Sequence, residues 1–101
     1  MIAFNHNELD DVVHAPVRLG VLAYLITAGS EDFTALRDQL EVTDGNLSIH
    51  LKKLEEAGYV GVVRKIVDRK TRTTVKITAA GRAAFVAYLD EIGKLARPPK
   101  G

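Results

Sequence analysis

The sequence predicts an α+β, mostly helical fold of the winged helix-turn-helix type, with a three-helix core and a two- to three-stranded wing. Two observations predict it. Helical patterns over residues 35–40 and 44–57 are separated by a very short connection, and the second is amphipathic, which is typical of a helix-turn-helix. Directly after Gly58 the apolar period changes to that of a strand, and two β-rich segments follow each other across a polar loop.

The chain of 101 residues is long enough for one domain with its own core, and we assign residues 1–97 to it and residues 98–101 to a flexible tail. The absence of cysteine excludes disulfides, thiolate metal sites and cysteine nucleophiles. The N-terminus lacks the basic region of a signal peptide, and the longest apolar run, near residues 21–26, is too short to span a bilayer. The sequence therefore favours a cytoplasmic protein without a membrane partner.

Two helices are expected before the helix-turn-helix. Asn7 is a suitable N-cap for a short helix over residues 8–14, whose early carboxylates favour the helix dipole. Pro16 fits the first turn of a second helix, over residues 16–28, which Gly29 ends. This second helix has more apolar residues than a single stripe needs, so we expect it to be buried on most sides.

The first helix of the helix-turn-helix is expected to be short. Residues 30–32 read as a turn, and Phe33 as a very short strand. Thr34 is a suitable N-cap for about two helical turns over residues 35–40, with Leu36 and Leu40 facing inward.

The helix expected over residues 44–57 has two contrasting faces, with Thr43 as N-cap and Gly58 as its C-terminal stop. At about 100° per residue, one side is made of leucines and faces the core. The other side fits a DNA major groove, although an ordinary solvated helix face has the same composition. It is small at its start, polar in the middle and basic at its end: Gly45, Asn46, Ser48, Ile49, Lys52 and Lys53.

A basic hairpin follows. Residues 60–67 and 73–77 are predicted strands around a polar loop, 68–72. The cations favour contact with DNA phosphates, whereas a hairpin that only blocks edge-to-edge aggregation would also be charged. Arg64 or Lys65 could instead pair with Asp68 or another carboxylate. The basic residues between 64 and 76 are Arg64, Lys65, Arg69, Lys70, Arg72 and Lys76.

The last predicted helix covers residues 79–96, with Thr78 as N-cap. An apolar stripe of helical period runs along it: Phe85, Tyr88, Leu89, Ile92 and Leu95.

The net charge of +1 conceals an asymmetry between the two halves. Residues 1–44 hold two arginines against eight carboxylates, a net charge of −6, and residues 45–101 hold twelve Lys or Arg against five carboxylates, a net charge of +7. This distribution favours a polyanionic partner for the second half.

Two motifs resemble a known family. TDGNLSIHLKKLEEAGYV at residues 43–60, followed by VDRKTRTTVKITAAGRAAF at residues 67–85, is similar to the compact winged-helix transcriptional regulators of the MarR and ArsR groups. The likeness covers roughly residues 12–95, and its most specific part combines the first motif, the basic wing and the T-x-x-G-R-x-A-F entry to the last helix. The chain lacks the longer flanking helices of typical MarR proteins and the cysteines of many metal-sensing ArsR proteins. A small-molecule effector is therefore supported by no sequence feature.

The resemblance implies a homodimer on a near-palindromic operator in double-stranded DNA, with each recognition helix in a major groove and each wing along the backbone or minor groove. It also implies a C-terminal dimerisation helix that pairs together with the first long helix, which agrees with the surplus apolar surface on both. The residues expected at the dimer interface are Val17, Val21, Tyr24, Phe85, Tyr88, Leu89, Ile92 and Leu95.

Base contacts are expected from the polar start of the recognition helix, by the amide of Asn46, by Ser48 and by Ile49 against a thymine methyl group. Lysines and the wing are expected to contact phosphates, with the wing tip the best candidate. The full predicted DNA-binding set is Thr43, Gly45, Asn46, Ser48, Ile49, Lys52, Lys53, Arg64, Arg69, Lys70 and Arg72.

Other polar residues are assigned structural roles. His50 lies beside the core face and is expected to be packed and hydrogen-bonded rather than a ligand. His6 and His14 lie near acidic residues without a convincing ligand spacing, so neither a metal site nor a cofactor is predicted. Glu55 and Glu56 look like helix surface, and no nucleophile accompanies them, so an enzyme is not expected.

The leading hypothesis is a homodimeric, sequence-specific DNA-binding transcriptional regulator, most simply a repressor. The alternative is a winged-helix module that binds other proteins through its apolar helices and does not bind DNA.

Overall fold

The computed structural model describes residues 9–96, so the expected Asn7 cap and the tail over residues 98–101 lie outside the described residues. Within the described range the chain forms four helices and three strands, in the order expected of a winged helix-turn-helix, and the predicted fold class is confirmed. The elements are α1 Pro16–Ala28, β1 Ser30–Asp32, α2 Phe33–Leu40, α3 Asp44–Glu56, β2 Val60–Val67, β3 Lys70–Ile77 and α4 Ala79–Ala96.

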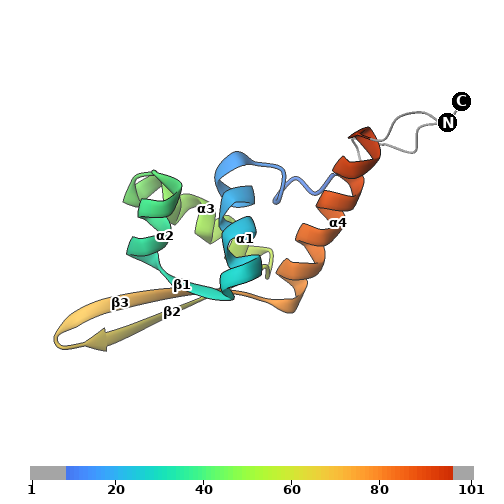
Figure 1. Ribbon diagram of the computed structural model, residues 1–101. Coiled ribbons are helices and arrows are strands. Elements are labelled where there is room, and N and C mark those ends of the chain that lie inside the picture. The colour runs from blue at the N-terminus through green and yellow to red at the C-terminus, as the bar shows by residue number, and fades with distance from the viewer. Residues whose placement is uncertain (1–8, 97–101) are drawn as a thin grey trace, which may run out of the picture.

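The three strands form one antiparallel sheet in the order β1-β3-β2. β1 pairs with β3 over three residues only, from Ser30 opposite Lys76 to Asp32 opposite Thr74. β2 and β3 pair along their whole length, from Val60 opposite Ile77 to Val67 opposite Lys70. The outer half of the hairpin therefore extends past β1 and past the helices as a two-stranded wing, while α4 projects on the other side of the molecule (Figure 1).

The core lies between the three helices α1–α3 and the inner part of the sheet. Helix α1 supplies Val21, Leu22 and Leu25, all fully buried, as expected for a helix covered on most sides. The leucines predicted to face inward from α3 are buried, and Phe85 and Tyr88 of α4 close the core from the other end. Its remaining buried members are Val13, Leu36, Val60, Val75 and Ile77.

Both predicted N-caps next to the functional elements are confirmed. Oγ1 of Thr43 accepts the backbone N–H of Asn46 at 3.1 Å, and Oγ1 of Thr78 accepts the backbone N–H of Gly81 at 3.0 Å. Gly58 has φ +80, the left-handed conformation that a glycine adopts without strain after a helix.

The prediction of a helix over residues 8–14 is wrong for residues 9–14, the part that the structure describes, because residues 11–13 form a turn. Asp10 explains the difference. Its Oδ1 accepts the backbone N–H groups of Val12 at 2.8 Å and Val13 at 3.3 Å, and its Oδ2 accepts the hydroxyl of Tyr59. A carboxylate that binds the backbone ahead of it stabilises a turn in competition with a helix.

The predicted boundary between residues 30 and 35 is also wrong. Ser30–Asp32 form a strand rather than a turn, and Phe33 begins α2 rather than forming a strand. The N-cap is Asp32 instead of Thr34, and its carboxylate makes no capping hydrogen bond. The strand exists because β3 pairs with it from more than forty residues away, which no local pattern signals.

The predicted hairpin loop, residues 68–72, is too long. Val67 pairs with Lys70, so the turn contains only Asp68 and Arg69, and β3 begins at Lys70 instead of Thr73. The two turn residues have φ of 50 and 66, as a two-residue hairpin with left-handed central residues requires. Such turns are usually marked by glycine, whose absence made the loop look longer.

Candidate nucleic-acid interface

The polar face of α3 is open to solvent. Asn46, Ser48, Lys52 and Lys53 are all exposed, and the side chain of Ile49 is 60% exposed although it is apolar. The same helix buries Leu47, Leu51 and Leu54 on its other side. The predicted division of α3 into a core face and an outer face is therefore present in the structure.

Two arginines contact α3 from the neighbouring helices, one through an ion pair and one through a hydrogen bond. Arg37 of α2 donates to Oδ1 of Asp44, in the first turn of α3, at 2.8 Å, and also pairs with Asp38. These carboxylates raise the pKa of Arg37. The contact links the two helices of the helix-turn-helix on their exposed side.

Arg18 of α1 makes the second contact. Its Nη1 lies 3.0 Å from Nδ1 of His50, while Nε and Nη2 donate to the carbonyl oxygens of Val12 at 2.6 Å and Asp11 at 3.2 Å. Because a guanidinium only donates, Nδ1 of His50 accepts and the imidazole is neutral. Burial, and then the charges of Arg18 and Lys53, lower the pKa of His50. The prediction of a packed, hydrogen-bonded histidine matches this geometry.

We expect this histidine to make stability depend on pH. Because the folded pKa lies below the ordinary 6.5, the unfolded chain binds more protons near that pH. The stabilisation is complete above about pH 6.5 and is lost as the pH falls toward the lowered folded pKa. Urea unfolding between pH 5 and 7.5 should show this loss, and His50→Gln should flatten it. A His14→Gln variant controls for removing an imidazole elsewhere, and an unchanged pH profile in His50→Gln would contradict the assignment.

The wing has two faces, which the register defines. The inner face is the outward continuation of the side of the sheet that faces the core. It carries Val62, Arg64 and Ile66 on β2 and, opposite them, Val75, Thr73 and Thr71 on β3. The outer face carries Lys65, Lys70 and Arg72, and Arg69 lies in the turn. The cations are thus divided between two faces and the tip, as strand alternation predicts.

A groove runs between α3 and the inner face of the wing. Ser48 and Lys52 line it from the helix, and Arg64 and Thr73 line it from the hairpin. Residues predicted to contact DNA from both elements therefore border one concave surface. Its other lining residues are Phe33, Leu51, Glu55 and Val62.

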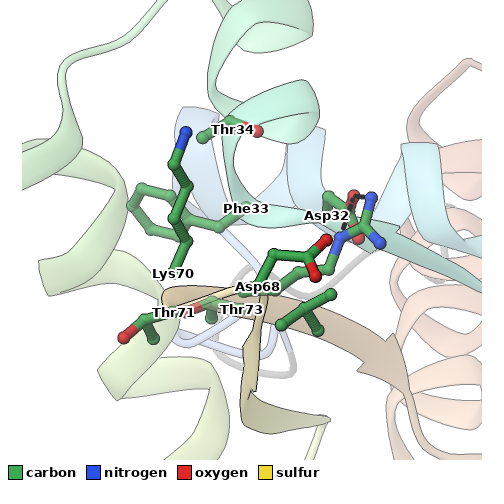
Figure 2. A pocket seen from close by; sticks show the side chains of 9 residues that line it. Asp32, Phe33, Thr34, Asp68, Lys70, Thr71 and Thr73 are labelled. Atoms are coloured by element: carbon green, nitrogen blue, oxygen red, sulfur yellow. Dashed lines mark hydrogen bonds and ion pairs between the residues drawn. The ribbon is translucent and has the colours of Figure 1, made fainter.

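Arg72 is already paired. Its Nε and Nη2 lie 3.1 and 3.0 Å from Oδ2 of Asp32, and Oγ1 of Thr74 donates to Oδ1 of the same carboxylate at 3.4 Å. Figure 2 shows this ion pair at the edge of a second hollow, where Asp32, Phe33 and Thr34 face the outer part of β3. Among the described residues neither Arg64 nor Lys65 forms an ion pair with Asp68, which was the alternative to DNA contact that the sequence left open.

Only part of the predicted dimer set is available to a partner. Val21, Phe85 and Tyr88 are buried within the chain itself, which corrects their predicted place at an interface. Val17, Tyr24 and Ile92 are partly buried against the same core, and the hydroxyl of Tyr24 donates to Glu31 at 2.6 Å. Leu89 and Leu95 are 50% and 61% exposed. Val86, 59% exposed on the outward side of α4, lies off the predicted stripe and was not in the predicted set.

Two further residues were not found from sequence. Asp32 pairs with Arg72, and Arg18 joins the turn before α1 to His50 of α3, and no local pattern signals either contact. In the part of the chain that the structure describes, no group of three or more His, Asp or Glu side chains is placed to hold a metal ion. No helix over residues 9–96 is long and apolar enough to cross a membrane.

Proteins of similar sequence and structure share the winged-helix fold described above. Residues 17–96 match the family model of the winged helix DNA-binding domain. An uncharacterized protein of Methanocaldococcus jannaschii is 40% identical over 86 residues, which are 85% of this chain and 94% of that protein. The structure of a transcriptional regulator homologue from Pyrococcus horikoshii OT3 is 32% identical, has a TM-score of 0.79 and covers 84% of both chains.

More distant structures share the fold alone. The PcaV transcriptional regulator from Streptomyces coelicolor, in complex with its natural ligand, is 16% identical with a TM-score of 0.73, over 89% of this chain and 62% of that one. Overoxidized AbfR bound to DNA is 22% identical with a TM-score of 0.67, over 75% of this chain and 57% of that one.

Proposed function

The chain belongs to the winged helix DNA-binding domain family and has the fold of MarR-type transcriptional regulators, and from this premise we propose that it represses transcription as a homodimer bound to a near-palindromic operator. The family and fold are those of DNA-binding regulators, not of enzymes. The proposal adds the dimer, the operator symmetry, the direction of regulation and the residues that contact DNA.

The observation that carries the proposal is the shared groove between α3 and the wing. The exposed polar face of α3 and the inner face of a cationic hairpin border one surface, so a duplex lying on α3 would also meet the wing. An interaction module would not need cations on both elements. The positive second half of the chain gives the same surface the charge that phosphates require.

Each exposed residue then has a role that its chemistry suits. The first turns of α3 enter the major groove, where Asn46 and Ser48 contact base edges and Ile49 contacts a thymine methyl group. Thr43 and Gly45 bring the helix N-terminus close to the DNA backbone, and the remaining residues contact phosphates: Lys52, Lys53, Arg64, Arg69, Lys70 and Arg72. Arg72 must leave Asp32 to do so.

The dimer uses the outward side of α4. Val86 and Leu89 are exposed apolar side chains on a helix whose opposite side is already buried in the core. A second copy of α4 would cover them and place two recognition helices in successive major grooves, which is what a near-palindromic site about one helical turn apart requires. Blocking polymerase by occupying such a site is the simplest form of repression.

Selection from a random duplex library at two salt concentrations tests the proposal. Enrichment of a near-palindrome by the purified protein supports it. Salt-sensitive binding without enrichment would indicate a non-specific DNA protein, and no binding at low salt would favour the protein-binding module instead.

The wing contribution is tested by salt dependence. Arg69→Ala combined with Arg72→Ala should weaken binding to all sequences and reduce the slope of log K against log salt by about one unit per lost phosphate contact. Lys76→Ala is the matched control, because it removes a cation from β3 close to β1, far from the tip. An unchanged slope in the double variant would contradict the wing assignment.

The base-reading role of α3 is tested at Asn46. Asn46→Ala should cost about 1–3 kcal/mol at one base pair of the operator and relax the preference there. The fold should persist, since the capping bond at this residue uses its backbone N–H and not its side chain. Repeating the library selection measures the effect, and an unaltered preference at every position would remove Asn46 from the base-reading set.

A further inference from the structure

Ile66 is 80% exposed, more than any other large hydrophobic side chain in the described part of the chain. It lies near the end of β2, which is an edge strand of the sheet. Natural edge strands are usually protected by charge, because an exposed apolar edge promotes aggregation. Within residues 9–96, packing leaves 80% of this side chain exposed and does not explain an isoleucine at this position.

The face on which Ile66 lies is the inner one. Cross-strand pairing places it beside Thr71 and two residues from Arg64, which is paired with Thr73. Arg64 and Thr73 line the groove shared with Ser48 and Lys52 of α3. Two residues along a strand span about 7 Å, so Ile66 continues the same face beyond the groove toward the tip.

The surroundings of Ile66 are cationic. Only Arg64 lies on the same face, whereas Arg69 lies in the turn, and Lys65 and Lys70 lie on the opposite face of the hairpin, all exposed. An apolar protein partner that covered Ile66 would have to desolvate Arg64 and approach the charged tip, which is unfavourable. Duplex DNA suits this surface better. The deoxyribose walls of its minor groove are apolar, and the phosphates along both edges of the groove can pair with the cations.

We propose that Ile66 enters the minor groove of the operator and selects A·T pairs by excluding the 2-amino group of guanine. This inference rests on the proposed function, and it assigns a specificity role to a residue that carries no charge. The DNA lies on the inner face of the wing, with Arg64 on the backbone and Ile66 pointing into the groove.

The selectivity follows from hydrogen bonding. A·T and T·A pairs present only acceptors in the minor groove, whereas G·C adds an N–H donor on the guanine 2-amino group. An isoleucine side chain cannot accept from that donor, and its branched carbons would exclude the water that normally does. An unsatisfied buried donor is costly, so a G·C pair under Ile66 is disfavoured. The deoxyribose walls supply the apolar contact that remains favourable with A·T.

The test uses the duplex obtained from the library selection, with adenine replaced by 2,6-diaminopurine one position at a time. This base adds an amino group in the minor groove and leaves the major-groove edge unchanged. Wild-type protein should lose about tenfold in affinity at one or two positions outside the major-groove half-sites. In Ile66→Ala the loss at those positions should fall below about twofold. Ile66→Thr keeps β-branching and supplies an acceptor, so it should tolerate the added amino group.

Val63→Ala is the matched control. Val63 is also exposed on β2 but lies on the outer face, so its variant should keep the wild-type response to diaminopurine. Arg64→Ala should reduce the salt slope and keep that response. Equal sensitivity of Ile66→Ala and wild type, or a wild type indifferent at every such position, would overturn the inference and leave the DNA-binding proposal intact. A wild type that binds no duplex would overturn both.

Discussion

Gly81→Ala should destabilise the fold by about 3 kcal/mol or more, the upper range for overpacking against atoms that cannot move. Gly81 is the third residue of α4, and a Cβ added there would lie 2.1 Å from the carbonyl oxygen of Tyr59 and 2.9 Å from its carbonyl carbon. That peptide is held in place, because the N–H of Tyr59 donates to the carbonyl of Leu54 and its own carbonyl accepts from Thr78. The start of α4 cannot move away from this turn without breaking the bond between the N–H of Thr78 and the Tyr59 carbonyl.

Urea unfolding of the two variants measures this effect against a control. Gly45→Ala is the matched substitution, since Gly45 is the second residue of α3 and an added Cβ meets nothing within 4 Å. Replacing it should stabilise the fold by about 0.5–1 kcal/mol. A Gly81→Ala protein within about 1 kcal/mol of wild type would mean that α4 is not fixed against the turn after α3.

The motif that contains Gly81 helped to predict the fold, although the sequence did not show why a glycine is needed there. The T-x-x-G spacing was part of the family resemblance, and the structure explains both ends of it. Thr78 caps α4 and Gly81 lets the first turn of α4 lie directly on the Tyr59 peptide. The bounds of α1, β2 and α4 were likewise predictable, because caps and apolar periods act within a few residues of the chain.

Elements that depend on distant pairing were not predictable. β1 is a strand only because Glu31 lies opposite Val75 on β3, and its own three residues are polar. The hairpin turn formed by Asp68 and Arg69 has the geometry usually signalled by Asn-Gly, without that signal. In both cases the sheet determines the local conformation.

In the candidate site, too, features set by nearby residues were predictable and features set by distant packing were not. The exposed face of α3 followed from helical periodicity, because three leucines define the core side and the rest must face outward. On α4, however, the strongest apolar stripe faces the chain's own core, which buries Phe85 and Tyr88. A stripe of helical period identifies a buried face without saying whether the covering surface belongs to the same chain or to another, and this is why the predicted dimer set contained core residues.

The exposed side of α4 therefore carries the dimer proposal, and Leu89→Glu should separate the protomers. Leu89 is 50% exposed within the chain, so the substitution should leave the protomer folded. At an interface the new carboxylate would be desolvated without a partner, which is strongly unfavourable. Sedimentation should show monomers at concentrations where wild type is dimeric. Val63→Glu, on the wing, is the control with a nearly equal exposure of 49%, and it should remain a dimer.

Loss of the dimer should be seen most strongly in DNA binding. Two linked recognition helices convert the second half-site contact into an intramolecular step, a gain of about 10²–10⁴ in affinity. The Leu89→Glu variant should therefore bind a full operator at least about 100-fold more weakly than wild type. Its affinity for a single half-site should be nearly unchanged, because Leu89 belongs to α4 and not to the recognition helix α3. A variant that stays dimeric with full operator affinity would show that the protomers associate through a different surface.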